Sequence, residues 1–195
     1  MSVRIISGQY RGASISVPRS ARPTLSRTRQ SLFDLLESSC LDRDVGEFFL
    51  DRIVLDCFAG AGALGLEALS RGAKYAFFVD NDGAAIKTLR SNIAKLHAEE
   101  KSYVIFSEIQ KIKPLHVISK NKNTKCDVVF LDPPYAASRV IPDVIDHLLQ
   151  GEWLTKNAVF VIEVSAEFDF SSDFIDKFEV IKSKQIASSK FVIAS

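Results

Sequence analysis

The sequence predicts an α/β protein with a doubly wound, mostly parallel seven-stranded sheet and an N-terminal extension formed by a β-hairpin and a helix. Segments typical of strands are apolar on both faces, as in a parallel sheet that helices cover on either side. These segments alternate with amphipathic helical patterns from about residue 52 onward. A glycine-rich loop joins the first of these strands to its helix, as in nucleotide-binding α/β folds.

The extension, which we place at residues 1–40, begins with two short strands. Residues 4–18, "RIISGQYRGASISVP", contain both strands around a glycine turn. A helix is expected next, capped by Thr24 or Ser26. The apolar face of this helix consists of Leu32, Phe33, Leu35 and Leu36.

The rest of the chain, residues 41–195, is expected to form the main domain. Its strands are predicted at 52–58, 75–80, 102–107, 126–132 and 157–164. Its helices are predicted at 63–72, 82–97, 115–118 and 140–151. The tail after residue 177 is expected to add two antiparallel strands.

Composition excludes several classes of protein. Apolar residues make up 47% of the 195 residues and charged residues 25%, as is typical of globular proteins. The apolar runs are far shorter than the roughly 18 residues of a membrane span, and the N-terminus lacks a signal-peptide pattern. Cys40, Cys57 and Cys126 have no metal-ligand spacing. We therefore expect reduced thiols, no metal site, no membrane association and a cytoplasmic location.

The net charge of +1 conceals a basic N-terminal arm. Residues 1–33 contain six arginines and no acidic residue, so the remaining residues sum to −5. Six arginines without a lysine argue against a merely solvated surface, because arginine suits bidentate contacts to phosphate. The arm therefore predicts an anionic partner, with nucleic acid as the first candidate.

The glycine-rich loop predicts a cofactor site. Gly60, Gly62 and Gly65 form a G-x-G-x-x-G pattern, and Asp80 ends the next strand 20 residues after Gly60. This is the dinucleotide fingerprint, although a turn that only allows helix–strand packing has the same pattern. Asp56 precedes the loop, which contains no basic residue. An acidic residue without a basic one favours the ammonium and sulfonium groups of S-adenosylmethionine over a pyrophosphate. Alternatively, Asp56 only caps a helix or a turn.

The segment 128–138, "VVFLDPPYAAS", ends an apolar strand on a carboxylate, two prolines and an aromatic ring. Ligands bind beyond the carboxyl ends of the strands in such a sheet, so Asp132 is expected to face the same crevice as the glycine loop. The prolines hold the Pro133 carbonyl at a set angle.

Asp132 and the Pro133 carbonyl are two acceptors for an exocyclic amino group, and Tyr135 is a stacking face for the base. Orientation and charge stabilisation would then supply most of the catalysis, once the base has left its own stack. The alternative is a proline-stiffened turn with a buried tyrosine.

The motifs "LDCFAGAGALGLEALSRGA" and "DPPY" together resemble the RsmD-type bacterial methyltransferases, which methylate N2 of a guanine in small-subunit ribosomal RNA. "RIISGQYRG" and "RPTLSRTRQSLF" are similar to two further motifs of that family, in the family's order. The resemblance covers roughly residues 3–165. It implies a Rossmann-like class I methyltransferase domain that uses S-adenosylmethionine, preceded by an extension that helps to hold RNA.

The predicted site falls into three sets of residues. The catalytic set is Asp132, Pro133 and Tyr135. The cofactor-binding set is Asp56, Phe58, Gly60, Gly62, Asp80, Asn81, Glu108 and Asp132. The RNA-binding set is Arg4, Arg11, Arg22, Arg27 and Arg29. The expected partner is ribosomal RNA, free or within an assembling small subunit, and the protein is expected to be a monomer.

Two segments depart from the family's pattern. Glu108-Ile109 stands where the family often has Asp-Ala or Asn-Ala, and "QIASSKF" replaces the family's C-terminal Tyr-Gly segment. An N6-adenine methyltransferase acting on DNA or RNA is the main alternative, because the same tetrapeptide serves adenine. Weaker alternatives are a protein-glutamine methyltransferase, a non-catalytic RNA-binding protein and an NAD-dependent oxidoreductase.

Overall fold

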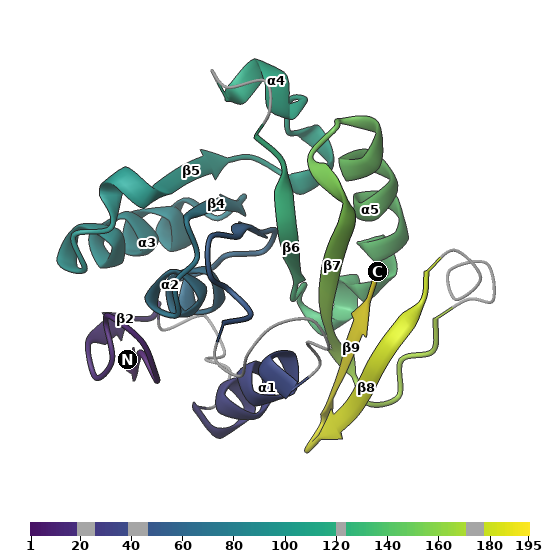
Figure 1. The fold of residues 1–195 in the computed structure, drawn as a ribbon, viewed down its shortest axis with the longest axis horizontal. Coiled ribbons are helices and arrows are strands. Elements are labelled where there is room, and N and C mark those ends of the chain that lie inside the picture. The colour runs from purple at the N-terminus through teal and green to yellow at the C-terminus, as the bar shows by residue number, and fades with distance from the viewer. Residues whose placement is uncertain (19–25, 39–46, 120–123, 171–177) are drawn as a thin grey trace.

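A seven-stranded sheet with helices on both faces forms the centre of the protein, and a two-stranded hairpin and a helix precede it (Figure 1). The computed structural model describes residues 1–18, 26–38, 47–119, 124–170 and 178–195. None of the helices in this described part of the chain is long and apolar enough to cross a membrane.

The strands and helices occur in the predicted order. The strands are β1 (Ser2–Arg4), β2 (Ser14–Ser16), β3 (Ile53–Asp56), β4 (Tyr75–Asp80), β5 (Ser102–Phe106), β6 (Cys126–Leu131), β7 (Leu154–Ser165), β8 (Val180–Ile186) and β9 (Ser189–Ala194). The α-helices are α1 (Ser26–Ser38), α2 (Ala63–Ser70), α3 (Gly83–Lys95), α4 (Leu115–Ile118) and α5 (Ile141–Gln150). Three 3₁₀ helices are η1 (Glu99–Lys101), η2 (Ile109–Lys111) and η3 (Tyr135–Val140).

The strand order β5-β4-β3-β6-β7-β9-β8 confirms the predicted fold class. Strands β3 to β7 pair in parallel, and β9 is antiparallel to both β7 and β8. The chain moves outward from β3 through β4 to β5 and then returns to place β6 on the other side of β3. The order therefore reverses between β3 and β6, which is where such sheets bind their ligands.

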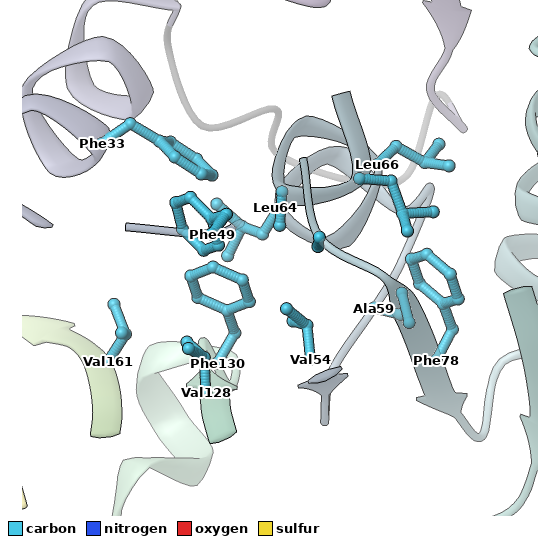
Figure 2. Close-up of a cluster of buried hydrophobic side chains, with 14 of the residues drawn as sticks. Phe33, Phe49, Val54, Ala59, Leu64, Leu66, Phe78, Val128, Phe130 and Val161 are labelled. Atoms are coloured by element: carbon cyan, nitrogen blue, oxygen red, sulfur yellow. The ribbon is translucent and has the colours of Figure 1, made fainter. Parts of the chain in front are cut away.

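Two apolar clusters cover the two faces of the sheet. On one face, α1, α2 and α3 pack against residues such as Val54, Phe130 and Val161. Figure 2 shows this cluster, in which the Phe49 ring lies between Phe33 of α1 and Phe130 of β6, with centroid distances of 5.3 and 6.3 Å. On the other face, α4 and α5 cover the alternate residues of the same strands. The alternation is the two-sided burial that a parallel sheet requires.

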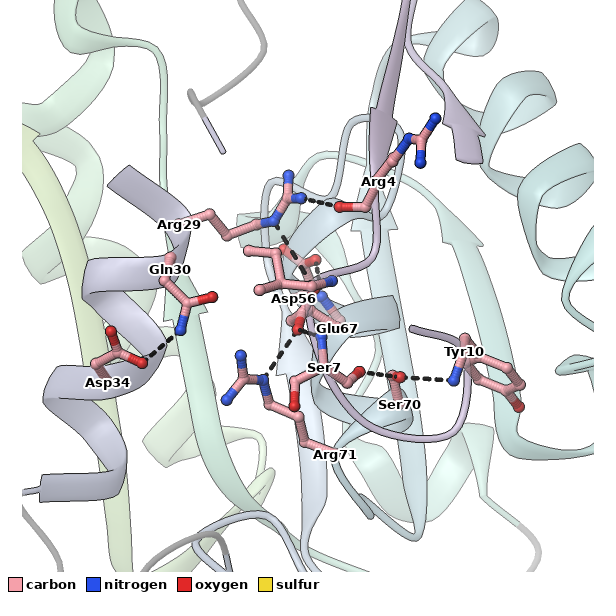
Figure 3. A network of polar contacts seen from close by, with 12 residues as sticks. Arg4, Ser7, Tyr10, Arg29, Gln30, Asp34, Asp56, Glu67, Ser70 and Arg71 are labelled. Atoms are coloured by element: carbon pink, nitrogen blue, oxygen red, sulfur yellow. Dashed lines mark hydrogen bonds and ion pairs between the residues drawn. The ribbon is translucent and has the colours of Figure 1, made fainter. Parts of the chain in front are cut away.

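The N-terminal hairpin is fixed to α2 by buried polar groups (Figure 3). The Glu67 carboxylate accepts hydrogen bonds from the backbone N–H groups of Ile6 and Ser7, at 2.8 and 3.0 Å. It also accepts one from Arg71 Nε, at 2.9 Å. Ser70 Oγ accepts a bond from Tyr10 N–H, at 2.8 Å. These contacts join the hairpin to the helix that follows the glycine loop.

Asn92 of α3 joins the hairpin to the glycine loop itself. Its Oδ1 accepts from Ser16 N–H, at 2.8 Å, and its Nδ2 donates to the carbonyls of Ser16 and Ala61, each at 2.9 Å. Asn92 is buried, so these bonds are protected from water. The hairpin, α3 and the loop are therefore held as one unit.

Candidate functional site

Three aspartates lie at the carboxyl ends of adjacent parallel strands. Asp56 ends β3, Asp80 ends β4, and Asp132 follows the last residue of β6. Because β3 pairs with both β4 and β6, the three carboxylates lie on the same edge of the sheet. The three residues therefore stand at neighbouring strand ends, as expected, and their facing a common ligand crevice stays a prediction.

The glycine loop between β3 and α2 adopts the backbone that only glycine tolerates well. Gly60 and Gly62 have φ angles of 52° and 84°. A Cβ atom at Gly62 would lie 2.4 Å from Leu89 Cδ1, so close packing also excludes a side chain there. A Cβ atom at Gly65 would lie 2.3 Å from Phe78 Cε1, which explains the third glycine as a helix–strand contact.

Asp80 holds the loop in place. Its Oδ2 accepts a hydrogen bond from Gly60 N–H, at 2.7 Å, and its Oδ1 accepts from Asp82 N–H, at 2.8 Å. Asp82 in turn caps α3, because its Oδ1 accepts from Ala84 N–H, at 2.9 Å. Since the Gly60 N–H already donates to a carboxylate, it is not a free donor for a phosphate. A contact between Asp80 and a ribose stays a prediction.

Asp56 makes the capping contact that the alternative interpretation expected. Its side chain is buried, and its Oδ2 accepts from Gly65 N–H in the first turn of α2, at 3.0 Å. Burial raises the pKa of Asp56 to about 7; the Gly65 bond opposes this rise, and the charge of Asp80 adds to it. A cation bound at this edge would restore the charged form of Asp56.

Three further members of the cofactor-binding set follow the carboxyl ends of β3, β4 and β5. Phe58 is half-buried against the core, and Asn81 is exposed directly after Asp80. Glu108 is exposed beyond β5 and pairs with Lys111, with 2.9 Å between Oε1 and Nζ. Their contacts to a cofactor stay predictions. Sequence reasoning did not include Phe106 in the candidate site. This residue ends β5, pairs with Asp80 and is 63% exposed.

The tetrapeptide after β6 places a carboxylate beside an exposed ring. Asp132 is half-buried and Pro133 is buried, whereas the Tyr135 ring is 40% exposed at the start of η3. Burial raises the pKa of Asp132 well above its ordinary value, and the nearby carboxyls of Glu163 and Asp56 raise it further. The alternative of a fully buried tyrosine is wrong.

The backbone of the tetrapeptide leaves one carbonyl available. The Pro134 carbonyl accepts from Ala137 N–H, at 2.7 Å, whereas no backbone hydrogen bond from the described residues reaches the Pro133 carbonyl. Pro134 has φ of −50° and ψ of 136°, which turns the chain into η3. The two acceptors expected from the sequence, Asp132 and the Pro133 carbonyl, are therefore both present at the sheet edge.

Sequence reasoning missed Glu163 and Ser189, which lie next to this tetrapeptide. The Tyr135 hydroxyl is 2.7 Å from Ser189 Oγ, which donates to Glu163 Oε1, also at 2.7 Å. A signal for Glu163 was present, because it is an acidic residue inside the apolar run "VFVIEV". Ser189 had no signal, since it lies in the tail segment that departs from the family's pattern.

The predicted arginine set divides into exposed and buried members. Arg4, Arg11 and Arg27 are exposed, and Arg22 lies outside the described residues. Arg29 is fully buried, which contradicts its predicted contact with RNA. Its guanidinium donates to the Arg4 carbonyl, and its Nε lies 3.9 Å from Glu67 Oε2 (Figure 3). Arg29 therefore stabilises the junction between α1, the hairpin and α2.

The structure does not indicate a metal centre in the part of the chain that it describes. No cluster of three or more His, Cys, Asp or Glu side chains with the geometry of a metal site occurs among these residues. Cys57 and Cys126 are buried free thiols, and burial raises the pKa of both. They are therefore neutral packing groups.

Comparisons with known proteins agree with this architecture. The family model described as Conserved hypothetical protein 95 matches residues 3–195. Ribosomal RNA small subunit methyltransferase D from Escherichia coli K12 is 35% identical over 167 residues, which cover 85% of this chain and 76% of that protein. The protein of the same name from Haemophilus influenzae is 32% identical over 173 residues, covering 85% and 80% of the two chains.

Solved structures show the same fold. The structure of yhhF from Escherichia coli has a TM-score of 0.78 and 31% identity, covering 100% of this chain and 97% of that one. The tRNA m1G37 methyltransferase from M. jannaschii has a TM-score of 0.64 at 18% identity, and covers 94% of this chain and 53% of its own.

The strand order, the glycine loop and the acidic sheet edge define a Rossmann-like methyltransferase. Within that class, the extent and identity of the matches show the family. The chain belongs to the ribosomal RNA small subunit methyltransferase D family, whose model is described as Conserved hypothetical protein 95.

Proposed function

We propose that this protein transfers a methyl group from S-adenosylmethionine to the exocyclic N2 amine of a guanine in small-subunit ribosomal RNA. The observation that carries the proposal is the position of Asp132, Pro133 and Tyr135 on the same sheet edge as the glycine loop. The names of the relatives support the substrate class.

The cofactor proposal rests on the charge of the sheet edge. Asp56, Asp80 and Asp132 provide three carboxyl groups, and the loop between β3 and α2 has no basic residue. Such an edge suits a ligand with ammonium and sulfonium groups better than a pyrophosphate. S-adenosylmethionine supplies the methyl group. Gly60 and Gly62 allow the close approach of this ligand, with Phe58, Asn81, Asp80 and Glu108 around it.

The chain's own residues orient the base. Tyr135 stacks on the base, Asp132 accepts one N–H of the amine, and the Pro133 carbonyl accepts the other. These contacts aim the nitrogen lone pair at the methyl group, so positioning supplies much of the rate. Methylation would make the amine acidic and Asp132 would take its proton, while the electron pair of the broken methyl–sulfur bond would stay on the sulfur of the cofactor. Once the positive charge of the cofactor restores its charged form, the raised pKa of Asp132 would make its carboxylate a better proton acceptor than an ordinary aspartate.

The N-terminal extension is the proposed RNA-contacting part, with its boundary near residue 40. Arg4, Arg11 and Arg27 are exposed on it and carry no acidic neighbour within the first 33 residues. Its hairpin and α1 share the core cluster of the sheet, so the extension presents the RNA to the site as a rigid part of the protein. We propose that the protein acts as a monomer in the cytoplasm, on RNA within an assembling small subunit.

A methyl-transfer assay tests the proposal. The purified protein is incubated with tritiated S-adenosylmethionine and small-subunit particles from cells that lack this enzyme, or with the free RNA, and the product is digested to nucleosides. We expect N2-methylguanosine. N6-methyladenosine would support the adenine alternative instead. RNA methylation would be refuted if the digest contained no labelled nucleoside.

A substitution at Asp132 tests the assigned role. Asp132→Asn is expected to lower the rate on guanine and to leave cofactor affinity nearly unchanged, because the interaction that it removes acts mainly in the transition state. Calorimetry with S-adenosylhomocysteine measures the affinity. Full activity of Asp132→Asn would exclude the carboxylate as proton acceptor.

A further inference from the structure

A chain of two hydrogen bonds connects the exposed tyrosine to a buried carboxylate. The Tyr135 hydroxyl and Ser189 Oγ are 2.7 Å apart, as are Ser189 Oγ and Glu163 Oε1. The single hydroxyl proton of Ser189 is donated to the carboxylate. Ser189 Oγ must therefore accept the hydrogen bond that the Tyr135 hydroxyl donates, so both hydrogen bonds are donated in the direction of Glu163.

The three residues belong to separate parts of the fold. Tyr135 begins η3, Ser189 begins β9, and Glu163 lies in β7. In the β7–β9 ladder Ser189 pairs with Ser165 and Phe191 pairs with Glu163, which puts Ser189 diagonally next to Glu163 on one face of the sheet. The bonds therefore tie the loop after β6 to the antiparallel edge of the sheet.

Glu163 is buried between two groups of the site, because it accepts a hydrogen bond from Ser189 and its carboxyl lies near that of Asp132. It is 6% exposed within an apolar strand, and its Oε2 has no hydrogen-bond partner among the described residues. A partly satisfied buried carboxylate destabilises a fold, and an apolar side chain of similar size would pack there at lower cost. Burial raises the pKa of Glu163, and the bond from Ser189 opposes this rise. An apolar residue could provide neither the contact with Ser189 nor a carboxyl near Asp132.

We propose that Ser189 and Glu163 are positioning residues of the methyl-transfer site, which hold the Tyr135 ring at a fixed angle through its hydroxyl. This inference rests on the proposed function. Ser189 and Glu163 are each only 6% exposed, so they reach a bound base through Tyr135 and do not contact it themselves. Two prolines fix the backbone before Tyr135, and the hydrogen bond fixes the remaining rotation of its side chain.

The inference changes what is expected of a phenylalanine at position 135. If only the face of the ring mattered, Tyr135→Phe would keep full activity. With the hydroxyl as an anchor, Tyr135→Phe is expected to lower kcat/KM on the RNA by about five- to tenfold, as for the loss of one hydrogen bond. Ser189→Ala is expected to lower it to the same extent.

A double-mutant cycle on the full-length protein tests the anchor. The variants are Tyr135→Phe, Ser189→Ala and the two together, assayed with small-subunit particles and tritiated S-adenosylmethionine. We expect the double variant to be no worse than either single variant, because both remove the same bond. Affinity for S-adenosylhomocysteine is expected to stay unchanged in all three.

Two controls separate positioning from folding. Ser183→Ala removes a hydroxyl from an exposed residue of β8 in the same hairpin, and is expected to keep full activity. Glu163→Gln retains an oxygen that accepts from Ser189, so the coupling between Tyr135 and Ser189 is expected to persist in its background, even though the loss of a carboxyl beside Asp132 changes the rate. Tyr135→Phe changes an exposed residue, so the anchor is tested even where Ser189→Ala fails to fold.

The outcomes distinguish this inference from the proposed function. A wild-type protein that methylates no RNA refutes the proposed function and the inference with it. An active wild-type protein with fully active Tyr135→Phe or Ser189→Ala overturns the inference alone. Additive losses in the double variant also overturn it, because they would mean that Ser189 acts independently of the Tyr135 hydroxyl.

Discussion

The buried carboxyl of Asp56 makes the stability of this protein depend on pH. Burial is the largest cause that raises its pKa from 3.8 to about 7. A group with a raised pKa binds more protons in the folded than in the unfolded state between these two values. The free energy of unfolding therefore falls as the pH rises through this window, and the stability present at low pH is lost above the folded pKa.

The size of this effect follows from the two pKa values. Their difference corresponds to about 4 kcal/mol once Asp56 is fully ionised. Between about pH 5 and about pH 8 the loss amounts to about 3 kcal/mol. Asp56→Asn keeps an oxygen that accepts from Gly65 N–H and cannot ionise, so its free energy of unfolding lacks this part of the pH dependence.

Urea unfolding of both proteins across this pH range measures the effect. The difference between the two curves isolates Asp56 from Asp132 and Glu163, whose pKa values are also raised. Asp143→Asn, at an exposed position in the first turn of α5, controls for the loss of one carboxylate. Parallel curves for the wild type and Asp56→Asn would refute the reasoning, because they would show that Asp56 does not titrate in this window.

Three further predictions concern the cofactor, the RNA and the hairpin. Asp80→Ala is expected to weaken S-adenosylmethionine binding by about 1–3 kcal/mol in calorimetry, because it removes the acceptor of Gly60 N–H and the hydrogen bonds that we propose to the ribose. Replacing the exposed Arg4, Arg11 and Arg27 by Gln is expected to flatten the log–log salt dependence of RNA binding by about one unit for each phosphate that an arginine no longer neutralises. Glu67→Ala is expected to lower the free energy of unfolding by about 3–5 kcal/mol, because it leaves buried Arg29 without its carboxylate and Arg71 with Glu37 alone.

Matched variants give each of these predictions a control. Asp80→Asn keeps one acceptor and is expected to bind the cofactor better than Asp80→Ala does. Lys87→Gln removes an exposed charge from α3, outside the arm, and is expected to leave the salt dependence unchanged. The cofactor prediction would be contradicted by equal affinities of the wild type and Asp80→Ala. The RNA prediction would be contradicted by an unchanged salt dependence in the arginine variant, and the hairpin prediction by a Glu67→Ala variant as stable as the wild type.

Periodicity was sufficient to predict the strands and helices, because the parallel strands are apolar on both faces and the helices on one. It also contained the signal for the burial of Arg29, which stands three, four and seven positions before Leu32, Phe33 and Leu36 on the same face of α1. Charge alone had suggested a surface role. Helical spacing is therefore the stronger guide to whether such an arginine is exposed.

The site was only partly predictable for a physical reason. Motifs made of residues that are neighbours in the sequence, such as the glycine loop and "DPPY", identify strand ends, and the sheet brings strand ends together. The contact of Tyr135 with Ser189 spans 54 residues and depends on how β9 pairs with β7. No local pattern specifies such a contact, so it became visible only in the folded chain.

The attachment of the hairpin to α2 has a consequence for the order in which the chain folds. Two three-residue strands are too short to be stable alone, and the carboxylate that accepts from Ile6 and Ser7 comes about 60 residues later. At about 5–20 residues per second, the ribosome needs about 3–12 seconds to make that stretch. The arm is synthesised first and can attach to α2 only later. A nascent chain that does not yet include Glu67 therefore exposes every arginine of the arm, including Arg29.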